Sequence, residues 1–156
     1  MDSEKQREVQ KSKNIETQLV MSLIKNGLFL QRKLGQVCQQ FNLNTNQFLV
    51  INEIILKGPL SQKELCNRLL FEKSNISKII KTLQDKELIS VSVAPADRRS
   101  TLLIETVKGI EIWKDCLQSF NHSSADLMTS LSDRELLDIL ELLKKTGQSF
   151  SYMESQ

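Results

Sequence analysis

Residues 60–109 read LSQKELCNRLLFEKSNISKIIKTLQDKELISVSVAPADRRSTLLIETVKG, and this stretch decides the fold of the chain. It opens on Ser61-Gln62-Lys63-Glu64, a capping-box pattern that starts a short helix. A turn near residues 70–72 leads to a second helix that ends near Asp85. Alternating apolar and Ser residues then predict a strand over 88–94, a polar loop over 95–100 and a returning strand over 101–105. Two helices in close succession followed by a hairpin predict a winged helix-turn-helix.

The second helix of this motif presents DNA-reading chemistry. Once Ile76, Ile79, Ile80 and Leu83 are assigned to the core, a polar set is left for the solvent face. Its members are Lys73, Ser74, Asn75, Ser77, Lys78, Lys81 and Thr82, and all but Thr82 are candidate DNA contacts. Asn pairs with adenine, Lys donates to guanine or phosphate, and Ser serves base edges or phosphate. These residue types therefore favour a helix that lies in the major groove.

The hairpin tip carries Asp97-Arg98-Arg99. Arginine suits a narrow, A·T-rich minor groove because the negative potential is enhanced there. Asp97 can hold a guanidinium group by a charge-assisted hydrogen bond and so orient it. Which of the two arginines enters the groove is left open. Residues 57–109 contain ten Lys and Arg against six Asp and Glu, a net charge of +4, whereas the rest of the chain carries −2. This imbalance favours a polyanionic partner for the middle of the chain.

Helices are predicted on both sides of the motif. Apolar residues recur at helical spacing over 15–41, and a second helix follows Thr45, a predicted N-cap, and stops at Gly58-Pro59. Thr106 is predicted to cap a helix that runs to about His122, and a second capping box at residues 132–135 opens the last helix. The predicted fold class is mainly α with a small β-hairpin wing, in a single domain over residues 1–156.

The first and last helices have apolar faces wider than one packing contact needs. We therefore predict a helical dimerisation layer made from both termini, from residues 13–41 and 106–150, beside a winged helix-turn-helix region over 45–105. The alternative is that these faces pack within one subunit.

Composition excludes several classes of protein. The apolar runs are too short to span a bilayer, and the N-terminus is polar, so we expect a cytoplasmic protein with no membrane contact. His122 is the single histidine, and no glycine-rich phosphate loop is present, so we expect no metal, no cofactor and no enzymatic activity. The three cysteines are widely spaced, which argues against a disulfide framework.

These motifs resemble the MarR (multiple antibiotic resistance regulator) family of winged helix-turn-helix transcription factors. The matching stretches are Leu60–Leu65, Ser74–Ile80, the D-x-R signature at Asp97-Arg98-Arg99, and Thr106-Val107-Lys108-Gly109. The resemblance implies a homodimer that binds double-stranded, pseudo-palindromic operator DNA, usually as a repressor released by a small-molecule effector or by oxidation. It implies that Ser74, Asn75, Ser77 and Lys78 serve the major groove, and that an arginine of the wing serves the minor groove.

The chain departs from the family pattern at three positions. Leu70 and Glu87 stand where glycines are common, which implies altered turn geometry, and Glu105 replaces a leucine. Oxidation sensing would fall on Cys38 or Cys116, although a buried cysteine usually behaves as a small hydrophobe. A rival hypothesis is a winged-helix dimer that acts through protein–protein contact, like an antirepressor, without reading DNA.

Overall fold

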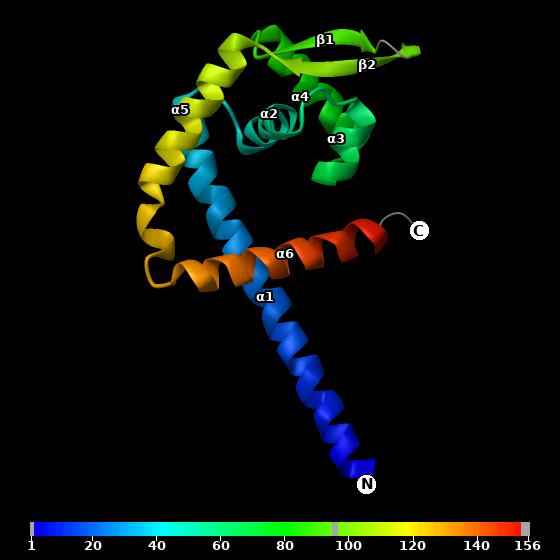
Figure 1. Cartoon of the computed structure of the whole chain (residues 1–156), viewed down its shortest axis with the longest axis vertical. Helices are drawn as coiled ribbons and strands as arrows, with labels where there is room; N and C mark the ends of the chain where they lie inside the picture. The colour runs from blue at the N-terminus through cyan, green and yellow to red at the C-terminus, as the bar shows by residue number, and fades with distance from the viewer. Residues whose placement is uncertain (1, 95–96, 154–156) are drawn as a thin grey trace. The chain divides into compact units, whose positions relative to one another are not determined.

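The computed structural model describes the backbone of residues 2–94 and 97–153 and the side chains of residues 13–93 and 101–147. Residues 1–36 form one compact unit and residues 37–156 form another. The elements, in chain order, are α1 (Asp2–Gln40), α2 (Thr45–Lys57), α3 (Gln62–Leu69), α4 (Lys73–Asp85), β1 (Ile89–Ala94), β2 (Asp97–Glu105), α5 (Val107–Ser123), the 3₁₀ turn η1 (Ala125–Met128) and α6 (Asp133–Met153) (Figure 1). The fold class predicted from the sequence is confirmed.

Capping side chains decide where the helices begin. The capping box at Ser61 and Glu64 is confirmed, since the Glu64 carboxylate accepts from the Ser61 N–H at 2.8 Å. The box at residues 132–135 is confirmed in the same way. The prediction of Thr45 as N-cap is wrong, because Asn44 caps α2: its Oδ1 accepts from the Gln47 N–H, and Gln47 returns a bond to the Asn44 N–H.

The core of the second unit is aliphatic and centres on α2 and α4. The four residues of α4 that were predicted to face inward are all buried, and so is Leu65 of α3. They pack with Val50, Ile51 and Ile54 of α2 and with residues at the start of the hairpin. The apolar face of α4 is therefore buried in the core, and its polar face stays exposed to solvent.

The two strands pair antiparallel, from Ile89 opposite Glu105 to Val93 opposite Thr101. The predicted loop over 95–100 is wrong over residues 97–100, because β2 begins at Asp97, whose backbone pairs with Ala94. One step along β1 thus corresponds to four along β2, and the ladder continues past this bulge.

The hairpin is buried only at its base. Leu88, Ile89 and Leu103 are buried, whereas Val91 and Val93 are 42% and 57% exposed. The expectation of a half-buried strand is therefore wrong for the outer half of β1. Among the described residues, none buries the side chains of Val91 and Val93, which lie farther along the hairpin than its buried base (Figure 1).

Leu70 and Glu87 have left-handed backbone conformations, with φ of 53° and 60°. The expected change of turn geometry at these two positions is wrong, because each takes the conformation that a glycine adopts freely. Leu70 follows α3 as its C-cap, and Glu87 lies in the turn between α4 and β1. The chain accepts local strain at both turns of the motif to keep its helices in place.

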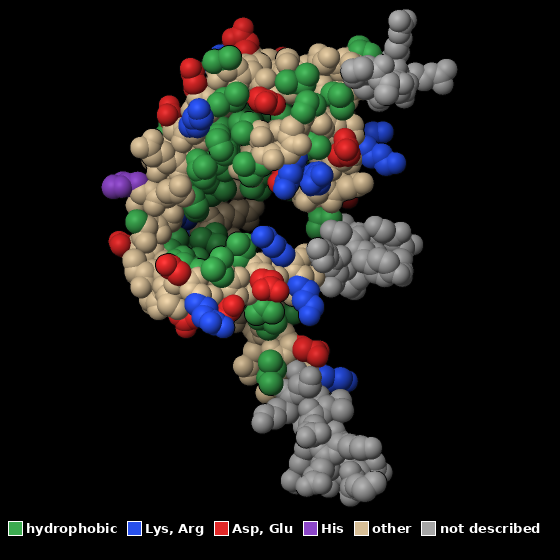
Figure 2. All heavy atoms as spheres, in the orientation of Figure 1, with side chains coloured by type: hydrophobic (Ala, Val, Ile, Leu, Met, Phe, Trp, Pro, Cys, Tyr) green, Lys and Arg blue, Asp and Glu red, His purple; other side chains and the backbone are tan. Residues whose placement is uncertain are grey.

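Apolar side chains remain uncovered on the terminal helices of the described chain. On α6, Leu137, Ile139, Leu140, Leu142 and Leu143 are exposed, and hydrophobic side chains are visible along this helix in Figure 2. On α1, exposure extends over Ile15, Leu19, Val20, Met21, Ile24, Leu28 and Phe29. Such long apolar faces on monomeric proteins mark interaction surfaces.

The strained turns give a stability prediction. Replacing Leu70 or Glu87 by glycine should raise the free energy of unfolding by about 0.5–1 kcal/mol, because the relief of left-handed strain exceeds the added entropy of the unfolded chain. Urea unfolding of each variant measures this difference. Leu70→Ala is the matched control, since it removes the exposed side chain but keeps the strained backbone. A glycine variant no more stable than that control would show that the turn is not strained.

Candidate nucleic-acid interface

One face of α4 gathers the polar residues predicted for the major groove. Lys73, Ser74, Asn75, Ser77, Lys78 and Lys81 are all exposed, while the opposite face of the helix is buried. Lys73, Ser74 and Asn75 form the first turn of the helix. The structure therefore brings this predicted set together on one solvent-facing surface, as major-groove reading requires.

The start of α4 is open. Asn44, Ser61 and Thr106 cap α2, α3 and α5 through their side chains, whereas Glu72 makes no side-chain hydrogen bond to α4. The first-turn N–H groups of α4 are thus not occupied by a capping side chain. A helix start of this kind has the polarity to receive a phosphate group.

Ser77 is already engaged within the protein. Its hydroxyl donates to the Lys73 carbonyl at 2.9 Å and accepts from Gln62 Nε2 at 2.6 Å. Gln62 is the first residue of α3, so this contact ties the start of α3 to α4. Sequence reasoning missed Gln62; the signal available was its place directly after the Ser61 cap, facing the next helix of the motif.

For the three predicted residues of the wing, the structure describes the backbone alone. Asp97, Arg98 and Arg99 belong to β2, and their side chains lie outside the described residues. The predicted pairing of Asp97 with an arginine therefore also lies outside them. Their position on the distal part of β2, past the buried base of the hairpin, puts them away from the core.

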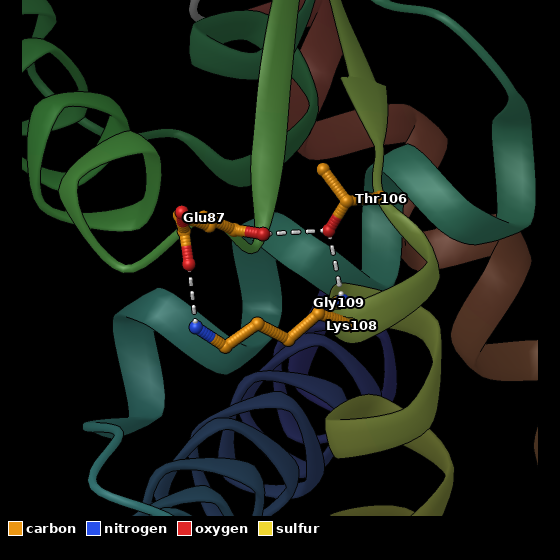
Figure 3. A network of polar contacts seen from close by, with 4 residues as sticks. All are labelled: Glu87, Thr106, Lys108 and Gly109. Carbon is orange, nitrogen blue, oxygen red and sulfur yellow. Dashed lines mark hydrogen bonds and ion pairs between the residues drawn. The ribbon is translucent and has the colours of Figure 1, made fainter.

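The base of the hairpin is held from two sides. Leu60, between α2 and α3, exchanges backbone hydrogen bonds with Leu103 of β2 at 2.8 and 3.2 Å. On the other side, Thr106 Oγ1 donates to the Glu87 carbonyl at 2.7 Å and accepts from the Gly109 N–H at 3.0 Å, and Lys108 pairs with the Glu87 carboxylate at 3.1 Å (Figure 3). The wing is therefore bonded to the helix-turn-helix and to α5.

Gly109 permits this junction. A Cβ at its position would lie 2.0 Å from the Leu88 carbonyl oxygen, a distance that no side chain can take. Packing thus explains why the T-x-x-G motif ends in a glycine. It allows the first turn of α5 to approach the backbone where β1 begins.

The two cysteines singled out for oxidation lie side by side. Cys38, in the last turn of α1, and Cys116, on α5, are both buried, with 3.8 Å between their sulfur atoms. Cys66 is half-buried on α3. Sequence alone could not pair Cys38 with Cys116, because their contact depends on how α5 packs in the second unit.

Within the described residues, no group of three or more His, Cys, Asp or Glu side chains could hold a metal ion. None of the described helices is both long and apolar enough to cross a membrane.

Comparison with known proteins gives the family. A model of the MarR family matches residues 41–100, which span α2, α3, α4 and the start of the wing. The HTH-type transcriptional regulator MhqR of Bacillus subtilis is 28% identical over 105 residues, covering 67% of this chain and 72% of MhqR. The HTH-type transcriptional repressor NicR of Pseudomonas putida is 30% identical over 110 residues, covering 70% of this chain and 69% of NicR.

Solved structures show the same fold. A MarR transcriptional regulator from Methanosarcina mazei matches with a TM-score of 0.74 at 20% identity, over 85% of this chain and 97% of that one. A mutant of E. coli MarR complexed with operator DNA matches with a TM-score of 0.67 at 21% identity, over 83% and 91%. BpsR of Bordetella bronchiseptica, whose DNA binding is regulated by 6-hydroxynicotinic acid, matches with a TM-score of 0.68 at 21% identity, over 81% and 90%.

Fold and relatives define a winged helix-turn-helix, DNA-binding transcriptional regulator rather than an enzyme. The chain belongs to the MarR family. The hypothesis of a winged-helix dimer that acts only through protein contact is not favoured, since these relatives are named as transcriptional regulators or repressors.

The bridge between α3 and α4 gives a second prediction. Gln62→Ala and Ser77→Ala should each lower the free energy of unfolding, and a double-mutant cycle should give a coupling of about 0.5–1 kcal/mol, the net value of one hydrogen bond. Lys63→Ala, one residue further along α3 and exposed, is the control and should leave stability nearly unchanged. Additive effects of the two substitutions would show that the bridge does not join the helices.

Proposed function

We propose that this regulator is a homodimeric repressor of a pseudo-palindromic operator. The observation that carries the proposal is the face of α4 on which six exposed polar and basic residues follow an uncapped helix start. Asn75 and Lys78 would read base edges in the major groove, while Ser74, Lys73 and Lys81 serve bases or phosphates. Ser77 would brace the helix through Gln62 and keep its second lone pair for a donor.

In this proposal the wing reads the minor groove. Arg98 or Arg99 enters an A·T-rich stretch beside the half-site, and Asp97 orients the guanidinium group. The support is the distal place of these residues on β2 and the anchoring of the hairpin base to α3 and α5. A hairpin fixed at its base can hold its tip at a constant distance from α4, as simultaneous contact with two grooves requires.

The proposal assigns the dimer to the chain ends. Residues 13–41 and 106–150 form the dimerisation region, and residues 45–105 form the DNA-binding region. Support comes from the exposed apolar faces of α1 and α6, each of which needs a cover that the described chain does not give it. A second copy of the same chain supplies such a cover and gives the twofold symmetry that a pseudo-palindromic operator mirrors.

A small-molecule effector is part of the proposal, on the analogy of BpsR, whose DNA binding 6-hydroxynicotinic acid regulates. We assign the effector no residues. The protein works in the cytoplasm, where the operator is.

The double variant Arg98→Ala with Arg99→Ala should weaken binding at least about tenfold, because both basic groups are lost from the wing tip. Asn75→Ala should instead relax base preference at one operator position. Fluorescence anisotropy with DNA from upstream of the protein's own gene, against a scrambled duplex of equal length and at several salt concentrations, measures both effects. Lys114→Ala, exposed on α5, is the control for loss of charge. Unchanged affinity in the double variant, or an equal loss in the control, would contradict groove reading by the wing.

Leu140→Asp should convert the dimer to a monomer, because it puts an unpaired charge into the proposed apolar layer. Leu140 is 48% exposed in the single chain, so the change has little effect on the fold itself. Sedimentation velocity gives the oligomeric state. Glu141→Lys, which changes charge on the polar side of α6, should stay dimeric. A Leu140→Asp variant that sediments as a dimer would rule out α6 as the interface.

A further inference from the structure

The side-chain amide of Gln62 lies against the first two turns of α4. Its Nε2 approaches the Ser77 hydroxyl oxygen at 2.6 Å and the Lys73 carbonyl oxygen at 3.4 Å. A carbonyl oxygen can only accept a hydrogen bond, so the nitrogen of the amide, and not its oxygen, must face α4. The orientation of the Gln62 amide is therefore fixed, and its Oε1 is left for another partner.

Ser77 has no free proton to offer. A serine hydroxyl carries one proton and two lone pairs. The proton is donated to the Lys73 carbonyl at 2.9 Å, and one lone pair accepts from Gln62. The second lone pair stays open, and the Ser77 side chain is exposed. Ser77 therefore presents a hydrogen-bond acceptor to solvent.

Gln62 presents a second acceptor beside it. Among the described residues, none donates a hydrogen bond to Gln62 Oε1, and the side chain is only half-buried. Ser77 lies in one row along α4 with Ser74 and Lys81, three residues after the first and four before the second. The two acceptor oxygens thus lie at the edge of the α4 face that we propose to contact bases.

We propose that Gln62 and Ser77 together read one exocyclic amino group in the major groove, the N6 group of adenine or the N4 group of cytosine. These amino groups are the donors that base edges offer there, whereas guanine O6 and thymine O4 are acceptors. An acceptor of the protein that faces an acceptor of the base leaves both without a hydrogen bond. The inference rests on the proposed function, since it names the base chemistry that part of this face recognises.

Reversing the preference would break hydrogen bonds within the protein. To present a donor, Ser77 would have to withdraw its proton from the Lys73 carbonyl. Gln62 would have to turn its amide, lose its bond to Ser77 and set Oε1 against that same carbonyl. Both acceptors are therefore held in place by the carbonyl oxygen of Lys73, in the first turn of α4.

The test removes single amino groups from DNA that lies upstream of the protein's own gene. Each adenine is replaced in turn by purine and each cytosine by pyrimidin-2-one, bases that lack only the exocyclic amino group. At one position of each half-site the natural full-length protein should lose affinity at least about fivefold, the effect of one lost base contact. Gln62→Met and Ser77→Ala should each reduce this loss, and together they should bring it below about twofold. Fluorescence anisotropy measures the affinities.

Two variants are matched controls. Ser77→Thr keeps the hydroxyl group, and Asn75→Ala changes a residue that reads another base, so both should keep the full loss at that position. The inference is overturned if no amino group affects binding, if the double variant keeps the loss, or if the two substitutions weaken binding to every duplex equally. Equal weakening would assign Gln62 a structural role alone. A natural protein that does not prefer the upstream DNA to a scrambled duplex would instead contradict the proposed function, and this inference with it.

Discussion

The close approach of Gly109 to the Leu88 carbonyl is the contact on which the arrangement of this regulator depends. Four elements meet there, because α4 ends and β1 begins beside it while β2 ends and α5 starts on the other side. Thr106 closes the junction by bonding to the Glu87 carbonyl and receiving the Gly109 N–H (Figure 3). Any side chain at position 109 would force α5 away from the hairpin. This backbone contact, together with the bonds between Leu60 and Leu103, positions the wing relative to α4 and α5.

The two faces of α4 have different roles: one packs in the core and the other faces solvent. The apolar face is buried and joins α4 to α2, α3 and β1, so it supplies the packing that orders the helix. The polar face contributes little burial, so its residues can vary without loss of core packing. Ser77 is the exception, since its bonds to Gln62 and Lys73 hold the angle between α3 and α4. A residue of the face that is proposed to contact DNA therefore also sets the geometry of that face.

Helix α5 joins chemistry that lies far apart in the sequence. Its first turn is locked to the wing, Trp113 bonds to α2, and Cys116 faces Cys38. A helix held at several points along one face moves as a rigid body, so a local change at one point is felt at the others. Helix α5 therefore links the base of the wing, α2 and the last turn of α1 within the second unit.

The sequence by itself determined the elements and their order. The informative signals were local ones, which can be recognised without knowledge of the fold. They are the capping boxes at Ser61 and Ser132, the helical spacing of Ile76, Ile79, Ile80 and Leu83, and the T-x-x-G motif. They were enough to predict a winged helix-turn-helix and the solvent-facing set on α4. The N-cap of α2 was predicted one residue too late, at Thr45 instead of Asn44, because Thr and Asn can both cap a helix.

Tertiary structure alone decided the rest. The contact of Cys38 with Cys116 and the bond between Gln62 and Ser77 join residues on different elements, and no periodicity encodes them. The early start of β2 depends on pairing across the hairpin, which a polar composition concealed. Leu70 and Glu87 hold left-handed conformations that their side chains disfavour, because packing of the helices on either side outweighs a local cost of about 1–2 kcal/mol. Contacts between residues far apart in the sequence depend on three-dimensional packing, whereas sequence spacing predicts only interactions between residues close together along the chain.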